Sequence, residues 1–141
     1  MKRFTRAACG AFILLLAVGV LSVPGSSQEK SPAEKIAGTW KISVDAGEGG
    51  IFYLDMELKF ENGELKGSVS ESMGSFTDIP LAKILLNEDI LVFEFKSVTP
   101  PDGVERLVQA EYKVAEDKME GQMTVADLSL TVPSTAERVK K

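Results

Sequence analysis

The chain of 141 residues contains no histidine, a single cysteine and a single tryptophan. Without histidine it lacks the commonest general base and the commonest transition-metal ligand of proteins. Ser-His-Asp triads, Cys-His pairs and the zinc motif HExxH are therefore excluded. We expect a protein that is not an enzyme and that needs no metal and no cofactor.

The one cysteine, Cys9, precedes a leucine-rich run near the N-terminus. A lipid-bearing cysteine would follow such a run, so Cys9 is not interpreted as a lipid attachment site. No cysteine follows it in the sequence. The rest of the chain must therefore be held together by burial and not by disulfides.

The N-terminal residues have the pattern of an export signal. Three basic residues within the first six positions precede an uncharged segment over 7–23, as in secretory signals. Small residues at 25–27 predict cleavage at that point. An uncleaved anchor is the alternative, because about 17 uncharged residues is the lower limit for crossing a bilayer. We expect a signal helix over 1–27, a periplasmic or extracellular location, and no stable membrane association after cleavage.

The charge balance is acidic, with 16 basic and 21 acidic residues and a formal net charge of −5. Loss of the three basic residues of the signal leaves 13 basic residues, for a net charge of about −8. An acidic surface repels phosphate backbones and anionic headgroups. We therefore expect neither nucleic acid nor anionic lipid as a partner.

The sequence after residue 37 alternates between apolar and polar residues. Apolar side chains occupy every second position from Phe52 to Phe60, as in a strand with one buried face and one solvated face. Asn62-Gly63 follows, which is typical of a tight hairpin. This pattern predicts eight strands, over 38–45, 51–60, 64–71, 76–86, 90–98, 106–115, 118–125 and 128–138.

These strands predict an all-β domain over 38–141, preceded by a linker or cap over 28–37. Eight short strands with short connections favour an antiparallel up-and-down β-barrel, because closure removes exposed sheet edges. A β-sandwich is the alternative.

An internal repeat favours closure. Residues 54–70 align without gaps on residues 108–124, and the identical pairs are Glu57 with Glu111, Lys59 with Lys113, and Gly67 with Gly121. Shared alternation does not explain the paired glycines. We interpret them as matching bends in two four-strand halves of one barrel.

In an up-and-down meander, successive connections lie at alternate ends of the barrel. Tight turns gather at one end, here called the tight-turn end, and the long connections 45–50, 71–76 and 97–105 gather at the other, the loop end. Loops on a rigid scaffold commonly carry function. Six carboxylates lie at the loop end: Asp45, Glu48, Glu71, Asp102, Glu105 and Asp127. The absence of a compact calcium-binding loop favours ordinary solvation over a metal site.

Seven inward apolar residues near the loop end are candidate ligand contacts. They are Val44, Phe52, Leu54, Val69, Phe95, Val108 and Val125. An eight-stranded barrel is either filled by its side chains or holds one small ligand, and the sequence leaves both open. Our leading hypothesis is binding of a small apolar or amphipathic ligand through the three loops. The alternative is a protein-interaction module with a packed interior, such as a periplasmic protease-inhibitor-like barrel.

The segment 38–40, Gly-Thr-Trp, resembles the G-x-W signature of the lipocalins and the wider calycin group, and with "ENGELKGSVSE" it is similar to the opening hairpin of avidin barrels. The whole pattern resembles compact, secreted bacterial β-domains. The resemblance implies that Trp40 closes the barrel end beneath a basic side chain of the last strand, for which Arg138 is the candidate, with its guanidinium stacked on the indole. Tyr112, an inward phenol, needs a hydrogen-bond partner, for which we expect a backbone carbonyl, with a bound ligand or water as the alternative.

Overall fold

The computed structural model describes Gly25 and residues 28–141, and the predicted signal otherwise lies outside the described residues. No helix in this described part is long and apolar enough to cross a membrane. The regular elements are α1 (Pro32–Ile36), β1 (Gly38–Asp45), β2 (Ile51–Glu61), β3 (Glu64–Glu71), β4 (Ile79–Pro80), β5 (Ala82–Asn87), β6 (Ile90–Thr99), β7 (Val104–Val114), β8 (Lys118–Val125) and β9 (Leu130–Arg138). Two short 3-10 helices, Gly47–Gly49 and Ala126–Leu128, lie in loops.

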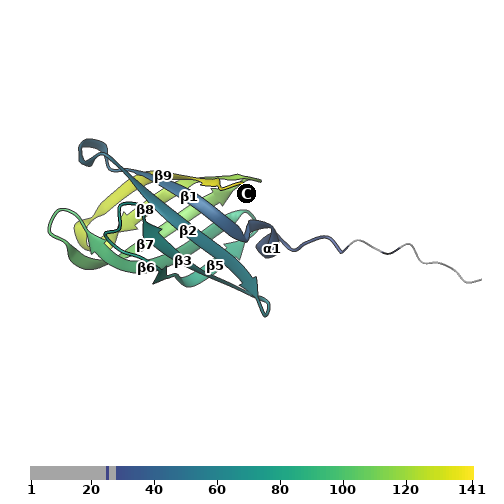
Figure 1. Cartoon of the computed structure of the whole chain (residues 1–141). Coiled ribbons are helices and arrows are strands. Elements are labelled where there is room, and N and C mark those ends of the chain that lie inside the picture. Colours follow the sequence, from purple (N-terminus) through teal and green to yellow (C-terminus); the bar gives the residue numbers. More distant parts are fainter. Residues whose placement is uncertain (1–24, 26–27) are drawn as a thin grey trace, which may run out of the picture.

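All strands belong to one sheet with the order β4-β3-β2-β1-β9-β8-β7-β6-β5, and every neighbouring pair is antiparallel. The sheet wraps around so that β1 pairs with both β2 and β9 (Figure 1). The chain is therefore an all-β, nearly closed antiparallel barrel, as predicted. A single wrapped sheet takes the place of the two packed sheets of the sandwich alternative.

The predicted count of eight strands is wrong, because the region 76–86 forms two strands and not one. β4 pairs with β3, whereas β5 pairs with β6. Leu81 lies between them, and its N–H donates to the carbonyl of Gly67 at 2.9 Å. Positive φ angles at Asp78 and Lys83, of 51° and 49°, redirect the backbone around this break. The chain thus changes partner within one predicted strand, and the barrel closes only in part.

The interior is filled by side chains. Along β2, buried residues on the inner face alternate with exposed residues on the outer face, as the sequence pattern predicts. The largest fully buried side chains are Trp40, Tyr112, Ile42, Met56, Leu58, Leu91, Met119 and Val69. Among the described residues, no buried side-chain polar atom lacks a hydrogen-bond partner. The barrel is consequently held together by a continuous apolar core in which the few polar groups are satisfied.

Tyr112 satisfies its hydroxyl in a way that differs from the prediction. Its Oη atom lies 2.7 Å from Oγ of Ser134, and that hydroxyl donates to the backbone carbonyl of Ser43 at 3.1 Å. The expectation of a direct bond to a carbonyl is therefore wrong, because Ser134 stands between the phenol and the backbone. Burial raises the pKa of Tyr112, and the hydrogen bond with Ser134 offsets only part of that rise.

The two glycines of the internal repeat occupy equivalent places. Gly67 is opposite Leu58, and Gly121 is opposite Tyr112, in the two aligned hairpins. A Cβ atom on Gly67 would lie 2.5 Å from the carbonyl oxygen of the preceding strand's Glu57, and one on Gly121 would overlap the Glu111 carbonyl. Both glycines therefore permit a close approach of neighbouring strands at matched positions.

Candidate functional site

The tight-turn end is closed by a plug built around Trp40. The indole is fully buried, and its Nε1 donates to the carbonyl of Ile36 at the end of α1, at 2.9 Å. The guanidinium carbon of Arg138 lies 4.4 Å from the centre of the indole, which is the stacked contact expected from the resemblance. α1 begins with a capping box in which Ser31 and Glu34 bond each other's backbone N–H groups.

Arg138 connects the last strand to the start of the domain. Its Nη atoms donate to the carbonyls of Ala37 at 2.8 Å and Lys35 at 2.6 Å, and its Nε donates to Asp117 at 3.0 Å. Gly38 makes room for this side chain, since a Cβ there would lie 2.9 Å from Nη1 of Arg138. Gly38 also has a φ of 138°, a conformation that favours glycine. The end that carries α1 is thus sealed and leaves no opening at Trp40.

The loop end of the barrel is built differently. The inner residues predicted as ligand contacts lie together on the inner face, and all are buried except Phe52, which is half-buried. They pack against one another and against Phe76 within the main core cluster. These side chains therefore occupy the interior at this level themselves.

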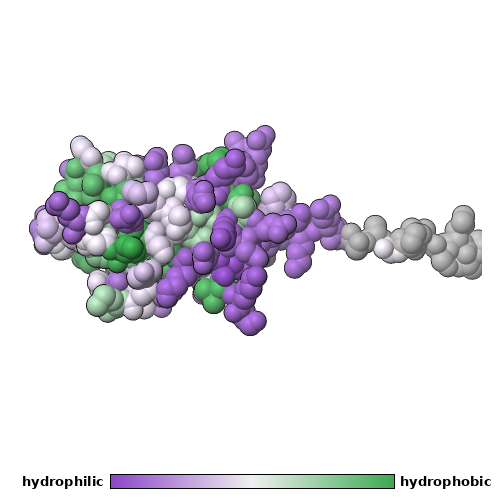
Figure 2. All heavy atoms as spheres, turned by 90° about the horizontal axis from the view of Figure 1, so that it is seen from above, coloured by the Kyte–Doolittle hydropathy of each residue, from purple (hydrophilic) through white to green (hydrophobic). Residues whose placement is uncertain are grey.

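Apolar side chains are also exposed at the loop end. They are Ile51, Met73, Val98, Val104, Leu128 and Leu130, of which Met73 is 93% exposed and Ile51 58%. We call these six residues the apolar rim. Figure 2 shows hydrophobic side chains gathered over the end away from the N-terminal tail, while hydrophilic ones dominate next to the tail. Grouped exposed apolar residues typically mark an interaction site.

Sequence reasoning missed the apolar rim because it followed the inward set. The signal was present as breaks in the alternation, where Ile51 precedes the inward Phe52 and Val98 separates the inward Ser97 and Thr99. Such a residue faces outward at the end of a strand, and period-two patterning assigns that face to solvent.

Three of the six carboxylates at the loop end have structural partners, and the first, Asp45, accepts a hydrogen bond from the backbone N–H of Gly47 at 2.9 Å. Glu71 accepts hydrogen bonds from the backbone N–H groups of Met73 and Ser75, at 3.0 and 3.1 Å. Desolvation raises the pKa of Glu71, but these bonds together outweigh it and lower the pKa below its usual value. Glu71 therefore holds the loop that presents Met73.

Asp102 forms a two-pronged ion pair with Arg106, with N–O distances of 2.6 and 2.7 Å. The hydrogen bond from Arg106 holds the pKa of Asp102 well below its usual range. Arg106 also donates to Thr99 at 2.9 Å, which fixes the connection between β6 and β7. Within the described residues, no three His, Cys, Asp or Glu side chains are grouped to hold a metal ion.

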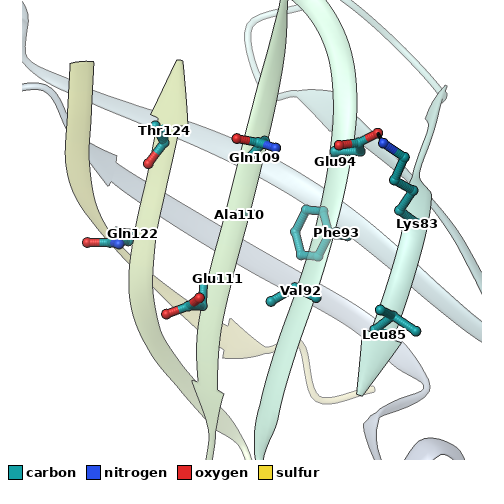
Figure 3. Close-up of a pocket in the computed structure, with 10 residues that line it drawn as sticks. All are labelled: Lys83, Leu85, Val92, Phe93, Glu94, Gln109, Ala110, Glu111, Gln122 and Thr124. Atoms are coloured by element: carbon teal, nitrogen blue, oxygen red, sulfur yellow. Dashed lines mark ion pairs between the residues drawn. The ribbon is translucent and has the colours of Figure 1, made fainter. Parts of the chain in front are cut away.

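Two hollows lie away from the barrel interior. One, of about 400 Å³, is on the outer face of β5 to β8, where the side chains of Gln109, Glu111, Gln122 and Thr124 surround it (Figure 3). Lys83 and Glu94 form an ion pair of 2.9 Å at its side. The other, of about 370 Å³, lies between β3 and β5 near α1.

The fold and these ends define a small acidic β-barrel with one plugged end and one apolar end. No protein-family model, curated protein or solved structure matches the chain. What the protein does is therefore inferred from its geometry.

Proposed function

We propose that this chain is an exported, non-enzymatic, calycin-like β-barrel that binds another protein through its loop end. The apolar rim is the observation that carries the proposal, because six exposed apolar side chains lie at the end opposite the plug. The filled interior supports a role for the outer surface over a role for a cavity.

The charges around the apolar rim restrict the partner. Asp45, Glu48, Glu105 and Asp127 have no ion pair within the described part of the chain, while Arg106 is occupied by Asp102. Carboxylates around an apolar centre favour a partner with an apolar patch bordered by lysine or arginine. They disfavour an anionic membrane, and they disfavour a second copy of this chain, which would bring like charges together.

A small apolar or amphipathic ligand is the second candidate. Phe52 and Phe76 are half-buried and connect the buried core to the exposed apolar rim. A ligand could lie across this surface, over the loops 45–50, 71–76 and 97–105. It would displace water from the apolar rim and would need no interior cavity.

The proposal is tested by crosslinking from the apolar rim. Met73 is replaced by a photoreactive amino acid. Crosslinked partners from the periplasm or the extracellular medium are identified by mass spectrometry. The affinity of the purified partner is then compared for the native chain and for the variant Ile51→Ser/Met73→Ser/Leu128→Ser. Loss of three apolar contacts should weaken binding at least about tenfold. The matched control Leu85→Ser/Ile90→Ser removes exposed apolar side chains outside the apolar rim and should bind like the native chain.

A neutral apolar dye, Nile red, distinguishes the second candidate. Saturable one-to-one dye binding that the triple variant loses, together with no crosslinked protein, would favour the small ligand. Equal partner binding by the triple variant and the control would contradict a role for the apolar rim.

A further inference from the structure

The barrel has a gap in its hydrogen-bonded wall. β3 and β5 lie on either side of it, and no strand pairing joins them in the described structure. β4 pairs only with Ser68 and Val69 of β3, and the last bond across the gap is from Leu81 to Gly67. From Gly67 toward the tight-turn end, the two edges therefore face each other without a ladder between them.

The backbone of these edges is available for pairing. The Gly67 carbonyl points into the gap, because it accepts the bond from Leu81. Backbone groups alternate in direction along a strand, so those of Leu65 point into the gap as well. Among the described residues, they have no backbone or side-chain partner on that side. The edge of β5 that faces away from β6 is likewise unpaired in this structure.

The hollow of about 370 Å³ in the gap is lined by both apolar and polar groups, with Glu64 among the polar ones. Phe60, Leu65, Ile84 and Leu86 contribute side chains to it, and Ala33 of α1 borders it. Its volume falls within the range of known ligand sites. Apolar walls that flank unpaired N–H and C=O groups are the features used by proteins that bind an extended peptide as an added strand.

Charge differs between the two ends of the gap. Glu61, Glu64 and Glu88 lie at its end near the hairpin turns, and none of them has an ion pair in the described structure. Lys66 and Lys83 lie toward the other end, next to Gly67 and Ala82 in the sequence, and Lys83 is paired with Glu94 at 2.9 Å. A strand with a basic end would match this arrangement.

We propose that the gap between β3 and β5 binds an extended polypeptide segment that carries apolar side chains at alternate positions and a basic residue at the end beside Glu64 and Glu88. The segment would add backbone hydrogen bonds to a free strand edge and place its apolar side chains in the hollow. This site is separate from the apolar rim, so either can fail without the other.

The test uses two fluorescein-labelled synthetic peptides of seven alternating valines and threonines, one with two lysines at its N-terminus and one with them at its C-terminus. Binding to the full chain is measured by fluorescence anisotropy. One peptide should bind saturably. Its analogue with N-methyl groups on alternate backbone amides should bind at least about tenfold more weakly, because the loss of two or three hydrogen bonds amounts to that factor.

Two further measurements locate the peptide. Glu64→Lys/Glu88→Lys should weaken binding about fivefold, while Glu48→Lys, a charge reversal at the loop end, should leave it unchanged. Hydrogen exchange should show protection of the Leu65 amide on binding. Three results would each overturn the proposal. Neither peptide binds saturably, or the N-methylated analogue binds as tightly as the unmethylated peptide. The third is that Glu48→Lys weakens binding as much as Glu64→Lys/Glu88→Lys.

Discussion

At the scale of single residues, the Trp40 side chain makes three separate stabilising contacts. Its indole is fully buried, its N–H bonds the end of α1, and its face receives Arg138. Each contact joins a different segment of the chain. The single tryptophan of the chain, near the start of β1, is therefore enclosed at the end of the barrel opposite the apolar rim.

We predict that Trp40→Ala lowers the free energy of unfolding by about 3–5 kcal/mol, as for other buried aromatic side chains truncated in a core. Urea denaturation followed by circular dichroism measures this. Tyr53→Ala, at an exposed position of β2, is the control and should change stability far less. If partner binding at the loop end were lost in the folded fraction of Trp40→Ala, the separation of the two ends would be wrong.

Tyr112 predicts a dependence of stability on alkaline pH. Burial raises its pKa in the folded state above the value of about 10 in the unfolded chain. Below pH 10 both states are protonated, so the full contribution is present. As the pH rises beyond 10, the unfolded state releases its proton first, and stability falls.

The variant Tyr112→Phe isolates this contribution. At pH 7 it should cost about 1 kcal/mol for the lost hydrogen bond to Ser134. The difference from the native chain should shrink above pH 10, as measured by denaturant unfolding at several pH values. A difference that stays constant to pH 11 would mean that the buried phenol does not control the alkaline loss.

At the scale of elements, the paired glycines show why a repeat is more informative than alternation. Gly67 and Gly121 have the same cross-strand position in their hairpins, where neighbouring backbone leaves little room for a side chain. Alternation indicates which face is buried, but it carries no information on how closely two strands approach. The repeated glycine indicates where two strands approach closely.

We predict that Gly121→Ala destabilises the fold by about 1–3 kcal/mol, because its Cβ would overlap the Glu111 carbonyl and force the strands apart. Gly67→Ala should cost less, since its nearest backbone contact is longer, at 2.5 Å, and two of its close neighbours are leucine side-chain ends. Thermal unfolding of both variants ranks them. If Gly67→Ala lowered the melting temperature more than Gly121→Ala, the distance to the neighbouring backbone would not be what sets the cost.

The sequence predicted most strands because their inward residues follow a period of two and their turns contain residues that tolerate positive φ. It did not predict the break at Leu81, because apolar residues continue through β4 and β5 and the change of partner depends on the backbone at Asp78 and Lys83. The candidate inner residues were placed together correctly on one face. Whether they leave a cavity depends on how their side-chain volumes fit together, and the alternation of apolar and polar residues gives no information on that.

At the scale of the whole molecule, the two ends of the barrel differ in structure. α1, Trp40 and Arg138 close one end, and the apolar rim with its carboxylates forms the other. The net negative charge favours solubility despite the exposed apolar side chains. This asymmetry separates the residues that stabilise the fold from those proposed to bind a partner.

Deletion of residues 28–35 tests that separation. It removes the capping box of α1 and the Lys35 carbonyl that accepts a bond from Arg138, and it leaves Ile36 without its helix. The loss of this charge-assisted hydrogen bond and of ordered packing should cost about 1–3 kcal/mol, which lowers the melting temperature by several degrees in a domain of this size. Deletion of 28–30 alone, outside the helix, should leave the melting temperature nearly unchanged. Partner binding should persist in both deletions, because the apolar rim is intact. An unchanged melting temperature combined with lost partner binding would show instead that the N-terminal segment is the contact surface and that the cap is dispensable.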